Sequence, residues 1–469
     1  MARTGGPLIL ARVLPAERAL IERALRSRSR DEVFALIAPL RDRVTQDREI
    51  AEAWLTFLEA APGREGLVDD VRAALWAFPN DLPLLFAGLR ALLRADERRG
   101  PDEPALASAP ARVAIELGER ALASVIGPGD RAVLSALLGN AHRRLGPRHD
   151  AQAVELLEAA AKLSPRDGSV FFDLGLCHKW AGRFRAAALA FARAEERLGP
   201  KRAVLFNRAT IATASGDVEE AADGWRRLGF RVETSPGSLP LVHGEDGELL
   251  REVLVRVPTR GTGHSDHGVP DASIAFEVLG VAPLSPCHGV VRTPTARAAI
   301  VDFGDVILFD PAPVGRVPRE DGTTPILPLL HVIQRGDEKR FAFLALEQSA
   351  AEVERLGAAL PAGCVWYLHD TRVDRVCPRC AAGEAFLPHE HEAPTERRAV
   401  RGKLVVPAAV SLGDVRTSLE RAKGAAVLLA IPGLYEALGD TPTAGKHHKS
   451  WGVIERGLLA PSTAAASRA

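Results

Sequence analysis

Two cysteines and two histidines between positions 375 and 392 are the residues of this chain best suited to binding a metal ion. Cys377 and Cys380 have the C-x₂-C spacing, which lets two thiolates in a tight turn reach one zinc ion. His389 and His391 are two positions apart, so in an extended segment both imidazoles point to the same side. The sequence therefore predicts a zinc site formed by Cys377, Cys380, His389 and His391.

A zinc ion at such a site can either stabilise the fold or take part in catalysis. Four protein ligands close a zinc site and make it structural, whereas three ligands leave a position for a reactive water. The four candidate ligands lie close together in the sequence, which favours a structural metal. A reduced cysteine pair in a solvated loop and a redox pair remain as alternatives.

Other clusters have simpler explanations. Cys287 and His288 are adjacent, and adjacent strand residues point to opposite faces, so a turn with a buried cysteine is favoured over a catalytic pair. The loop 260–268 is best explained as a flexible linker, the stretch 446–449 as a solvated helix face, and the aspartates of 302–310 as turn residues. The sequence has no phosphate-binding glycine loop, serine-hydrolase elbow or H-E-x-x-H motif, so an enzyme is disfavoured.

The first half of the chain contains repeated helix pairs. In the segment 171–200, Ala187, Phe191 and Ala194 recur at spacings of four and three, which places them on one helical face. Gly175 lets a second helix approach closely, and Gly182 suits the turn between the two helices. The same residue types recur 34 residues later, at Gly216, Ala221 and Trp225. They also occur earlier in the chain, with two residues inserted, at Leu138, Gly139, Gly146, Ala153, Leu157, Ala160 and Pro165.

This pattern resembles the tetratricopeptide repeat (TPR) family over residues 131–230. The resemblance implies an all-α solenoid with a concave surface that binds a protein or peptide. Residues 15–125 are expected to be degenerate repeats, with an ordinary helical bundle as the alternative, which makes 1–230 one helical domain.

The resemblance also suggests which residues line the groove. Some family members clamp a peptide carboxylate, but here Ala136, Asp173 and Ala203 occupy clamp positions, so this clamp is not expected. Polar residues of the inner helices remain as candidates for the groove, with solvated side chains as the alternative for each: Asn140, Arg143, Asp173, Lys179 and Asn207.

The second half is organised differently. The segment 231–248 is rich in Pro, Gly and Ser and is expected to be a linker. Short runs rich in Val, Ile and Phe then predict strands, and strand–helix–strand order follows in 341–369 and 403–431. We expect an α+β domain over 249–460, with α/β as the alternative, that contains the possible zinc-binding segment 375–392, and a disordered tail over 461–469.

Composition sets limits on partners and setting. The chain has 469 residues, 46% of them hydrophobic, and a formal net charge of zero, so nothing global favours a nucleic-acid or membrane partner. Five cysteines without a framework favour a reducing cytoplasm. The scarcity of lysine against arginine indicates a codon-composition bias, and we expect a bacterial source. The sequence favours an interaction scaffold with a zinc-stabilised C-terminal domain. The alternative is a metal-dependent hydrolase to which the repeats bring substrate.

Overall fold

We describe the chain from a computed structural model. The structure describes residues 19, 30–60, 65–97, 109–125, 127–146, 149–244, 247–259, 276–297, 299–319, 322–349, 351–384, 389–423 and 427–459. The expected linker 260–268 and the expected tail 461–469 lie outside these residues.

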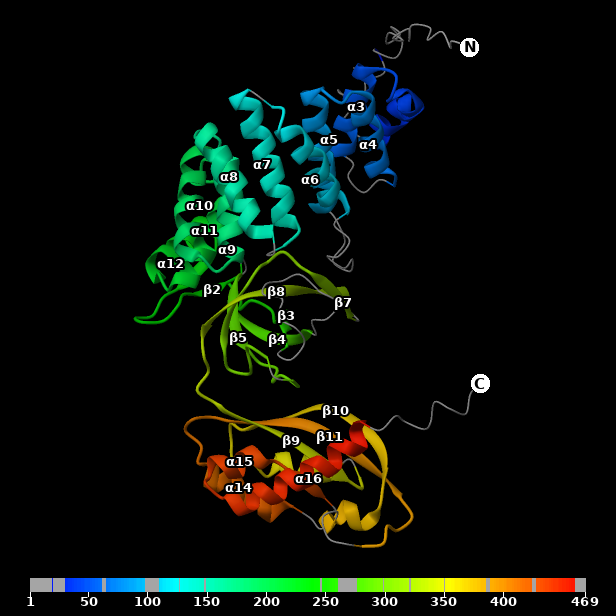
Figure 1. Cartoon of the computed structure of the whole chain (residues 1–469). Coiled ribbons are helices and arrows are strands. Elements are labelled where there is room, and N and C mark those ends of the chain that lie inside the picture. The colour runs from blue at the N-terminus through cyan, green and yellow to red at the C-terminus, as the bar shows by residue number, and fades with distance from the viewer. Residues whose placement is uncertain are drawn as a thin grey trace, which may run out of the picture.

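Helices fill the first half of the described chain and stack side by side (Figure 1). Each pair of antiparallel helices packs on the next pair along the sequence. The elements are α2 Arg30–Ile37, η1 Ala38–Arg43, α3 Arg48–Ala60, α4 Leu67–Ala77, α5 Leu82–Glu97, α6 Ala109–Leu122, α7 Pro128–Arg144, α8 Asp150–Leu163, α9 Gly168–Trp180, α10 Phe184–Leu198, α11 Arg202–Ser215 and α12 Val218–Arg227.

The repeated glycine and apolar positions pack against each other as their spacing predicts. A Cβ on Gly175 of α9 would lie 2.5 Å from the ring of Phe191 of α10, so only glycine admits this close approach. A Cβ on Gly139 of α7 would meet Leu157 of α8 at 2.7 Å. In the pair α11–α12 the glycine lies on the second helix, where Gly224 of α12 faces the small residue Ala209 of α11. Residues 131–230 therefore form TPR-type helix pairs, as the sequence predicted.

The segment 231–248, expected to be a linker, begins with a small sheet. Strands β1 Arg231–Glu233 and β2 Leu241–His243 pair antiparallel directly after α12. Val242 is fully buried in a cluster that also contains Trp225 of α12 and Leu228, which directly follows that helix. Apolar residues on alternate positions hold this segment against the helices, although its Pro and Gly content resembles that of a linker.

A closed sheet follows. Within the described residues it runs in the order β3-β4-β5-β6-β8, and β8 also pairs parallel with β3, while β7 adds to the outer side of β8. Its core contains Val255, Val281 and Phe309. The strands are β3 Val253–Pro258, β4 Phe276–Ser285, β5 His288–Val291, β6 Val306–Phe309, β7 Gly315–Arg319 and β8 Gly322–Gln334.

A second sheet, in the order β10-β11-β9-β12, forms the last part. Every hydrogen-bonded pair is antiparallel: β10 with β11, β11 with β9, and β9 with β12. This β-α-β-β-α-β order is the split arrangement typical of ferredoxin-like folds and makes this part α+β. The elements are β9 Lys339–Glu347, α13 Ala351–Ala358, β10 Val365–Val376, η4 Cys380–Glu384, β11 Thr395–Val406, α14 Leu412–Ala422, β12 Leu428–Ala430, α15 Pro432–Ala437 and α16 Thr441–Leu459.

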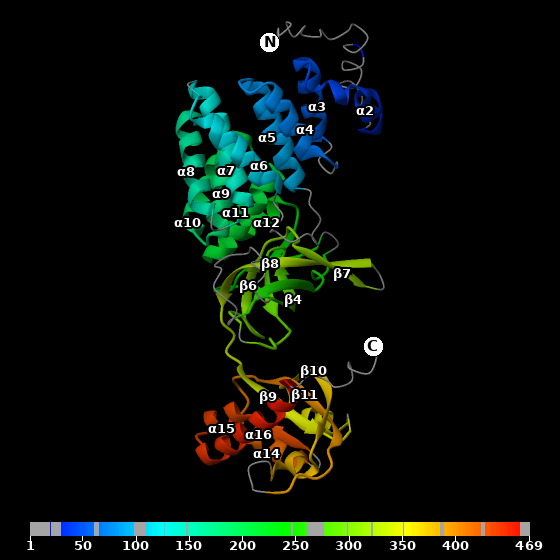
Figure 2. The same ribbon diagram turned by 45° about the vertical axis from the view of Figure 1, so that its right-hand side comes forward.

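The closed sheet lies between the helices and the second sheet in both views (Figure 1, Figure 2). Its contact with the helices is buried. Lys179 Nζ of α9 donates to Asp310 Oδ2 after β6 at 2.6 Å and to Asn207 Oδ1 of α11 at 2.8 Å. The Lys179 and Asp310 side chains are only 4% and 6% exposed. A charged pair removed from water in this way needs all its partners in place.

Apolar and small polar groups surround that ion pair. Leu205 of α11, Cys287 and Leu308 share one buried cluster. The Cys287 thiol also lies against the hydroxyls of Thr210 and Thr213, and burial raises its pKa to about 11. The helices and the closed sheet therefore share a core, so the segment between them does not separate two independent surfaces.

The other side of the closed sheet is joined to the second sheet by two aspartates. Asp302 Oδ2 accepts from Lys403 Nζ of β11 at 2.6 Å. Asp305, 1% exposed, accepts from Arg335 at 2.7 Å and from Arg340 of β9 at 3.2 Å. The aspartates of 302–310 thus do more than shape turns. Each is paired with a cation from a neighbouring part of the molecule.

Replacing Lys179 with Met is expected to lower stability by about 3–5 kcal/mol, because Asp310 would keep a buried, unpaired charge. Adding Asp310→Leu should recover most of the loss. Thermal unfolding of the single and double variants measures both effects. As a control, Arg72→Met breaks the Arg72–Glu116 pair, whose side chains are both 49% exposed, and should cost less than about 1 kcal/mol. Equal melting temperatures for Lys179→Met and the control would contradict the buried pair.

The buried His288 predicts a component of acid instability. It is fully buried, and desolvation lowers its pKa to about 4, while an unfolded histidine titrates near 6.5. The unfolded chain therefore binds a proton that the folded chain does not, and stability falls as the pH drops from about 6.5 to 4, by roughly 3 kcal/mol. In His288→Gln, urea unfolding across this window should show a slope smaller by about one proton. Parallel pH profiles for the two proteins would contradict the assignment.

Candidate metal centre

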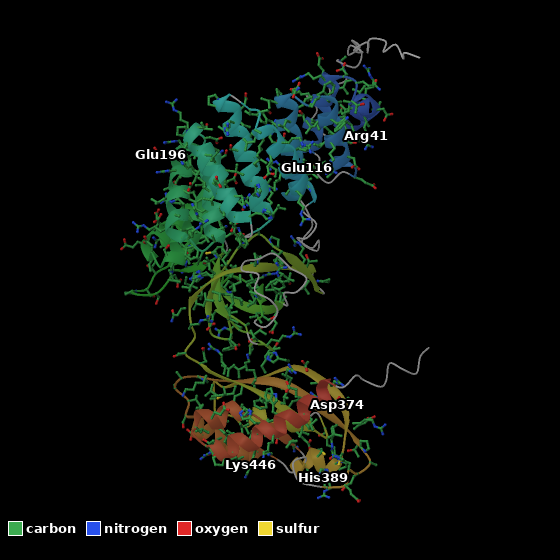
Figure 3. The ribbon with its side chains drawn as sticks, in the orientation of Figure 1. Arg41, Glu116, Glu196, Asp374, His389 and Lys446 are labelled. Carbon is green, nitrogen blue, oxygen red and sulfur yellow. The ribbon has the colours of Figure 1, made fainter. Side chains whose placement is uncertain are left out.

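The four predicted ligands meet at the tip of the long hairpin formed by β10 and β11. Cys377 directly follows β10, Cys380 begins η4, and His389 and His391 lie in the extended chain before β11. The two strands pair from Val365 and Val405 out to Val376 and Thr395, so their register brings the two ligand pairs together. Figure 3 labels His389 at the end of the molecule opposite the helical repeats.

The ligand atoms have the spacing of a tetrahedral zinc site. All four lie within 4.8 Å of one another. Cys377 Sγ is 3.7 Å from His389 Nε2, and Cys380 Sγ is 3.4 Å from the same atom and 3.5 Å from His391 Nδ1. With bonds of about 2.3 Å to sulfur and about 2.0 Å to nitrogen, a tetrahedral zinc separates sulfur from nitrogen by about 3.5 Å. The three sulfur–nitrogen distances match this separation, and the whole set, within 4.8 Å, can close around one zinc ion by small movements of the side chains.

The surroundings favour the thiolate form that binds a metal. The backbone N–H of Cys380 donates to the Cys377 sulfur, and His391, His389 and the Glu392 backbone add to the effect, which together lower the pKa of Cys377 to about 6. The two cysteines are buried, while His389 is half-buried and His391 is exposed. A metal held here would be covered by sulfur on the protein side and by imidazole on the solvent side.

The predicted groove residues have two different fates. Lys179 and Asn207 were expected to line an open groove, but both are buried. Lys179 pairs with Asp310, which follows β6, and donates to Asn207, so the closed sheet occupies this part of the repeat face. Sequence patterns could not show this, because Lys179 and Asp310 are 131 positions apart. Charge reversal at Lys179 would damage the fold and cannot report on binding.

The remaining three groove residues form one network. Asn140 Nδ2 of α7 donates to Asp173 Oδ2 of α9 at 2.8 Å, and Arg143 donates to Asn140 Oδ1 at 3.0 Å. Arg143 and Asp173 also form an ion pair at 3.7 Å, and each side chain is 19% exposed. These residues face water in part, so they remain candidates for contacts with a partner.

Two further clusters have structural roles. His447 accepts the backbone N–H of Ile431 through Nδ1, stacks near Tyr435, and has a pKa lowered to about 4 by burial, whereas His448 pairs with Glu436 at the surface. Ser285 contacts the sulfur of Cys287 and the ring of His288, but all three are fully buried. The atoms of Ser285, Cys287 and His288 are therefore closed to a substrate, whereas the exposed His448 is paired with Glu436.

Comparisons with known proteins extend only to the fold of the helices. No family model matches the sequence, and no curated protein matches it. Among solved structures, the chain is similar to YrrB, described as a TPR protein with an unusual peptide-binding site, at 17% identity and a TM-score of 0.27 over 38% of this chain and 83% of that one. It is also similar to TTC0263, a thermophilic TPR protein of Thermus thermophilus, at 18% identity and a TM-score of 0.29 over 45% and 90%.

Human IFIT1, solved as a dimer with m7Gppp-AAAA, is a further structural neighbour at 15% identity and a TM-score of 0.34. The match covers 45% of this chain and half the length of that one. With similarities this low, the assignment of TPR-type pairs rests on the packing of the helices themselves. None of the helices in the described residues is long and apolar enough to span a membrane.

Replacing Cys380 with Ser is expected to remove bound zinc and to destabilise the second sheet, because the binding energy of a structural zinc is partly folding energy. Zinc content by mass spectrometry and thermal unfolding measure the two effects. Cys364→Ser is the matched control, since Cys364 is a half-buried cysteine outside the cluster. Wild-type protein without stoichiometric zinc, purified without chelators, would contradict the site.

Proposed function

We propose that this protein is a TPR-containing interaction scaffold whose C-terminal α+β part is stabilised by zinc. The observation that supports it most is the series of helix pairs α7–α8, α9–α10 and α11–α12, in which each pair packs on its neighbour. Such arrays expose long surfaces that bind proteins or peptides. We divide the chain into a helical domain over 1–230, a connecting segment over 231–248, an α+β domain over 249–460 and a tail over 461–469, with the helical and α+β domains joined by the buried pair of Lys179 and Asp310.

In this proposal the binding groove is the half-buried network of Asn140, Arg143 and Asp173. An arginine and a carboxylate that already satisfy each other can exchange partners with a ligand at low cost, because both retain contact with water. The inner face beyond them is filled by the closed sheet through Lys179 and Asp310. A partner is therefore expected toward the N-terminal end of the repeats, with protein or peptide as its chemistry.

The zinc is assigned a structural role because the four ligands of the cluster would fill a tetrahedral shell. It would hold the end of the β10–β11 hairpin closed and fix the second sheet for contacts of its own. The alternative, a metal-dependent hydrolase, needs an open coordination position for water. X-ray absorption that reports two sulfur and two nitrogen ligands supports the structural role, and an oxygen ligand that exchanges with solvent supports the hydrolase.

The scaffold role is tested by affinity capture with the full chain as bait. Arg143→Glu should reduce recovery of a specific partner at least about tenfold. Because Arg143 is only 19% exposed and pairs with Asp173, the reversal also lowers stability, so recovery is compared at a temperature at which thermal unfolding shows the variant to be folded. Arg226→Glu, an exposed arginine on α12, is the matched control and should retain the partner. If Arg143→Glu and wild type recover the same proteins equally, the proposed groove is wrong.

A further inference from the structure

Strand β10 has a long free edge. It is a border strand of the second sheet and, within the described residues, pairs only with β11. In its second half Asp370, Thr371, Val373 and Arg375 are exposed, and Val373 is 65% exposed. A border strand presents unpaired backbone N–H and C=O groups, to which a further strand can add. The side chains beside this edge decide which strand that is.

These side chains lie on two faces of the sheet. Arg372 and Asp374 lie on the face covered by α16, because Ala399, opposite Arg372 on β11, packs in one buried cluster with Ile454 of that helix. Val373 points to the other face, since successive strand residues alternate. A strand that adds here therefore meets two opposite charges on one face and an exposed valine on the other.

The carboxylate of Asp374 is only half satisfied within the described chain. Figure 3 labels this residue on the β10–β11 hairpin. Its Oδ1 accepts from Arg372 Nε at 2.9 Å, whereas Oδ2 is buried and has no hydrogen-bond partner. Arg397 lies opposite on β11, but its Nε is also buried without a partner. Burial raises the pKa of the Asp374 carboxyl despite the neighbouring Arg372, as expected for a charge that lacks part of its compensation.

The charges of this edge complement those of a second copy. In an antiparallel pair with two-fold symmetry, one residue faces its own copy, and residues equally far from it face each other. Centred on Val373, this register places Arg372 opposite the partner subunit's Asp374, and Asp374 opposite the partner subunit's Arg372. Centred on Arg372 or on Asp374, it brings like charges together. Centred on Thr371, it pairs Asp370 with Arg372 and leaves Asp374 without a basic residue opposite.

We infer that β10 pairs antiparallel with β10 of a second copy of this chain, in the register centred on Val373. The pairing would join two four-stranded sheets into one continuous sheet. The two valines would cover each other, and the partner subunit's Arg372 would give Asp374 a second donor once the carboxylate turns toward the edge.

The edge charges favour a second copy over a foreign strand. Charges on a border strand usually prevent pairing, because like charges meet or charges are buried. Here two acidic and two basic residues cancel along the segment: Asp370, Arg372, Asp374 and Arg375. The segment therefore has no net attraction for an acidic or a basic peptide, while its own copy supplies opposite charges at the facing positions.

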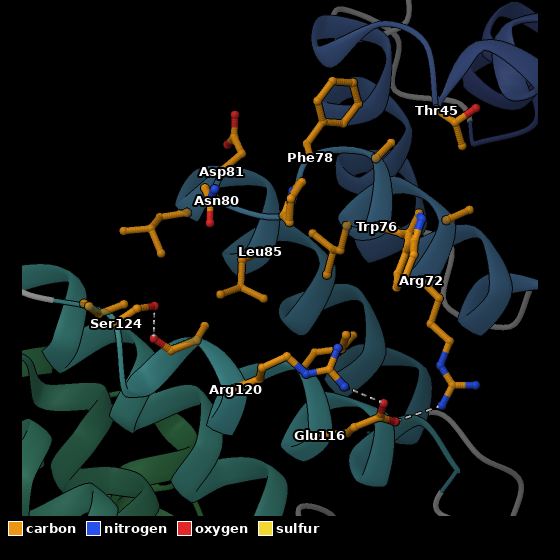
Figure 4. Close-up of a pocket in the computed structure, with 18 residues that line it drawn as sticks. Thr45, Arg72, Trp76, Phe78, Asn80, Asp81, Leu85, Glu116, Arg120 and Ser124 are labelled. Atoms are coloured by element: carbon orange, nitrogen blue, oxygen red, sulfur yellow. Dashed lines mark hydrogen bonds and ion pairs between the residues drawn. The ribbon is translucent and has the colours of Figure 1, made fainter. Parts of the chain in front are cut away.

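The open groove between α4 and α6 gives no comparable choice of partner (Figure 4). Trp76, which lines it, is 84% exposed, so the groove has an apolar contact to offer. Its lining charges cancel, however, and are not mirrored by another surface of the described chain: Arg72, Arg120, Asp81 and Glu116.

The test uses the full chain and three variants of exposed residues. Val373→Asp and Val373→Lys each place like charges opposite each other at the centre of the paired strands. Leu189→Asp is the matched control, since Leu189 of α10 is 64% exposed. Sedimentation velocity from nanomolar to submillimolar protein gives the dissociation constant of the dimer, and native mass spectrometry distinguishes a mixed dimer from the two homodimers. Circular dichroism confirms that each variant is folded.

Wild type and Leu189→Asp are expected to dimerise with dissociation constants within about twofold of each other. For each Val373 variant alone the dissociation constant should rise at least about tenfold, because the valine contact is lost and like charges meet. A mixture of Val373→Asp and Val373→Lys should form the mixed dimer in preference to either homodimer, because only the mixed dimer pairs opposite charges. Amide exchange in residues 370–376 should slow as the dimer forms.

Three results would overturn the inference: a monomeric wild type over the whole concentration range, a dimer that neither Val373 substitution weakens, or a mixture of the two variants without preference for the mixed dimer. A dimer unaffected at Val373 would place the interface on another surface. Recovery of a partner through Arg143 does not involve β10, so the proposed groove and this pairing can each fail without the other.

Discussion

The buried pair of Lys179 and Asp310 is the contact on which the arrangement of this molecule depends. It joins α9 to the end of β6, with Asn207 as a third partner, and it lies beside the cluster that contains Cys287 and Leu308. A buried ion pair tolerates few positions of its partners, because each charge loses water and must be compensated by specific contacts. The pair therefore fixes where the closed sheet sits on the repeats.

Asp302 and Asp305 extend the same principle to the other side of the closed sheet. Lys403 reaches Asp302, and Arg340 reaches Asp305, so strands β11 and β9 of the second sheet are each tied to one turn. The closed sheet thus connects the helical repeats to the second sheet, whose β10–β11 hairpin carries the Cys/His cluster. Part of the inner repeat face is used within the chain, so in the proposed function a partner would bind toward the N-terminal end of the repeats.

The sequence predicted most where the interactions are local. The spacing of Gly175, Phe191 and their equivalents predicted the helix pairs, because residues one helical turn apart share a face. C-x₂-C and H-x-H predicted the two ligand pairs, because a tight turn and an extended segment each place two side chains on one side. The register of the β10–β11 hairpin then brings the two pairs together. The runs of Val, Ile and Phe predicted most of the longer strands, but not which strands are neighbours. The roles of Lys179 and of the three aspartates were not visible, because their partners lie far away in the sequence, 131 positions for Lys179 and 101 for Asp302. The exposure of Trp76 could have been predicted from helical periodicity, since this residue falls outside the apolar face of α4.

The reactivity of the five cysteines toward a maleimide, followed by mass spectrometry, tests two claims. The first is that the helical repeats and the closed sheet share a buried core, and the second is that Cys377 and Cys380 bind zinc. The account predicts that Cys364 reacts first and that Cys177 and Cys287, both fully buried with raised pKa values, stay unmodified. Cys377 and Cys380 should react only after a chelator removes zinc, while Cys287 remains protected. Modification of Cys287 as fast as Cys364, or of Cys377 and Cys380 before chelation, would contradict the account.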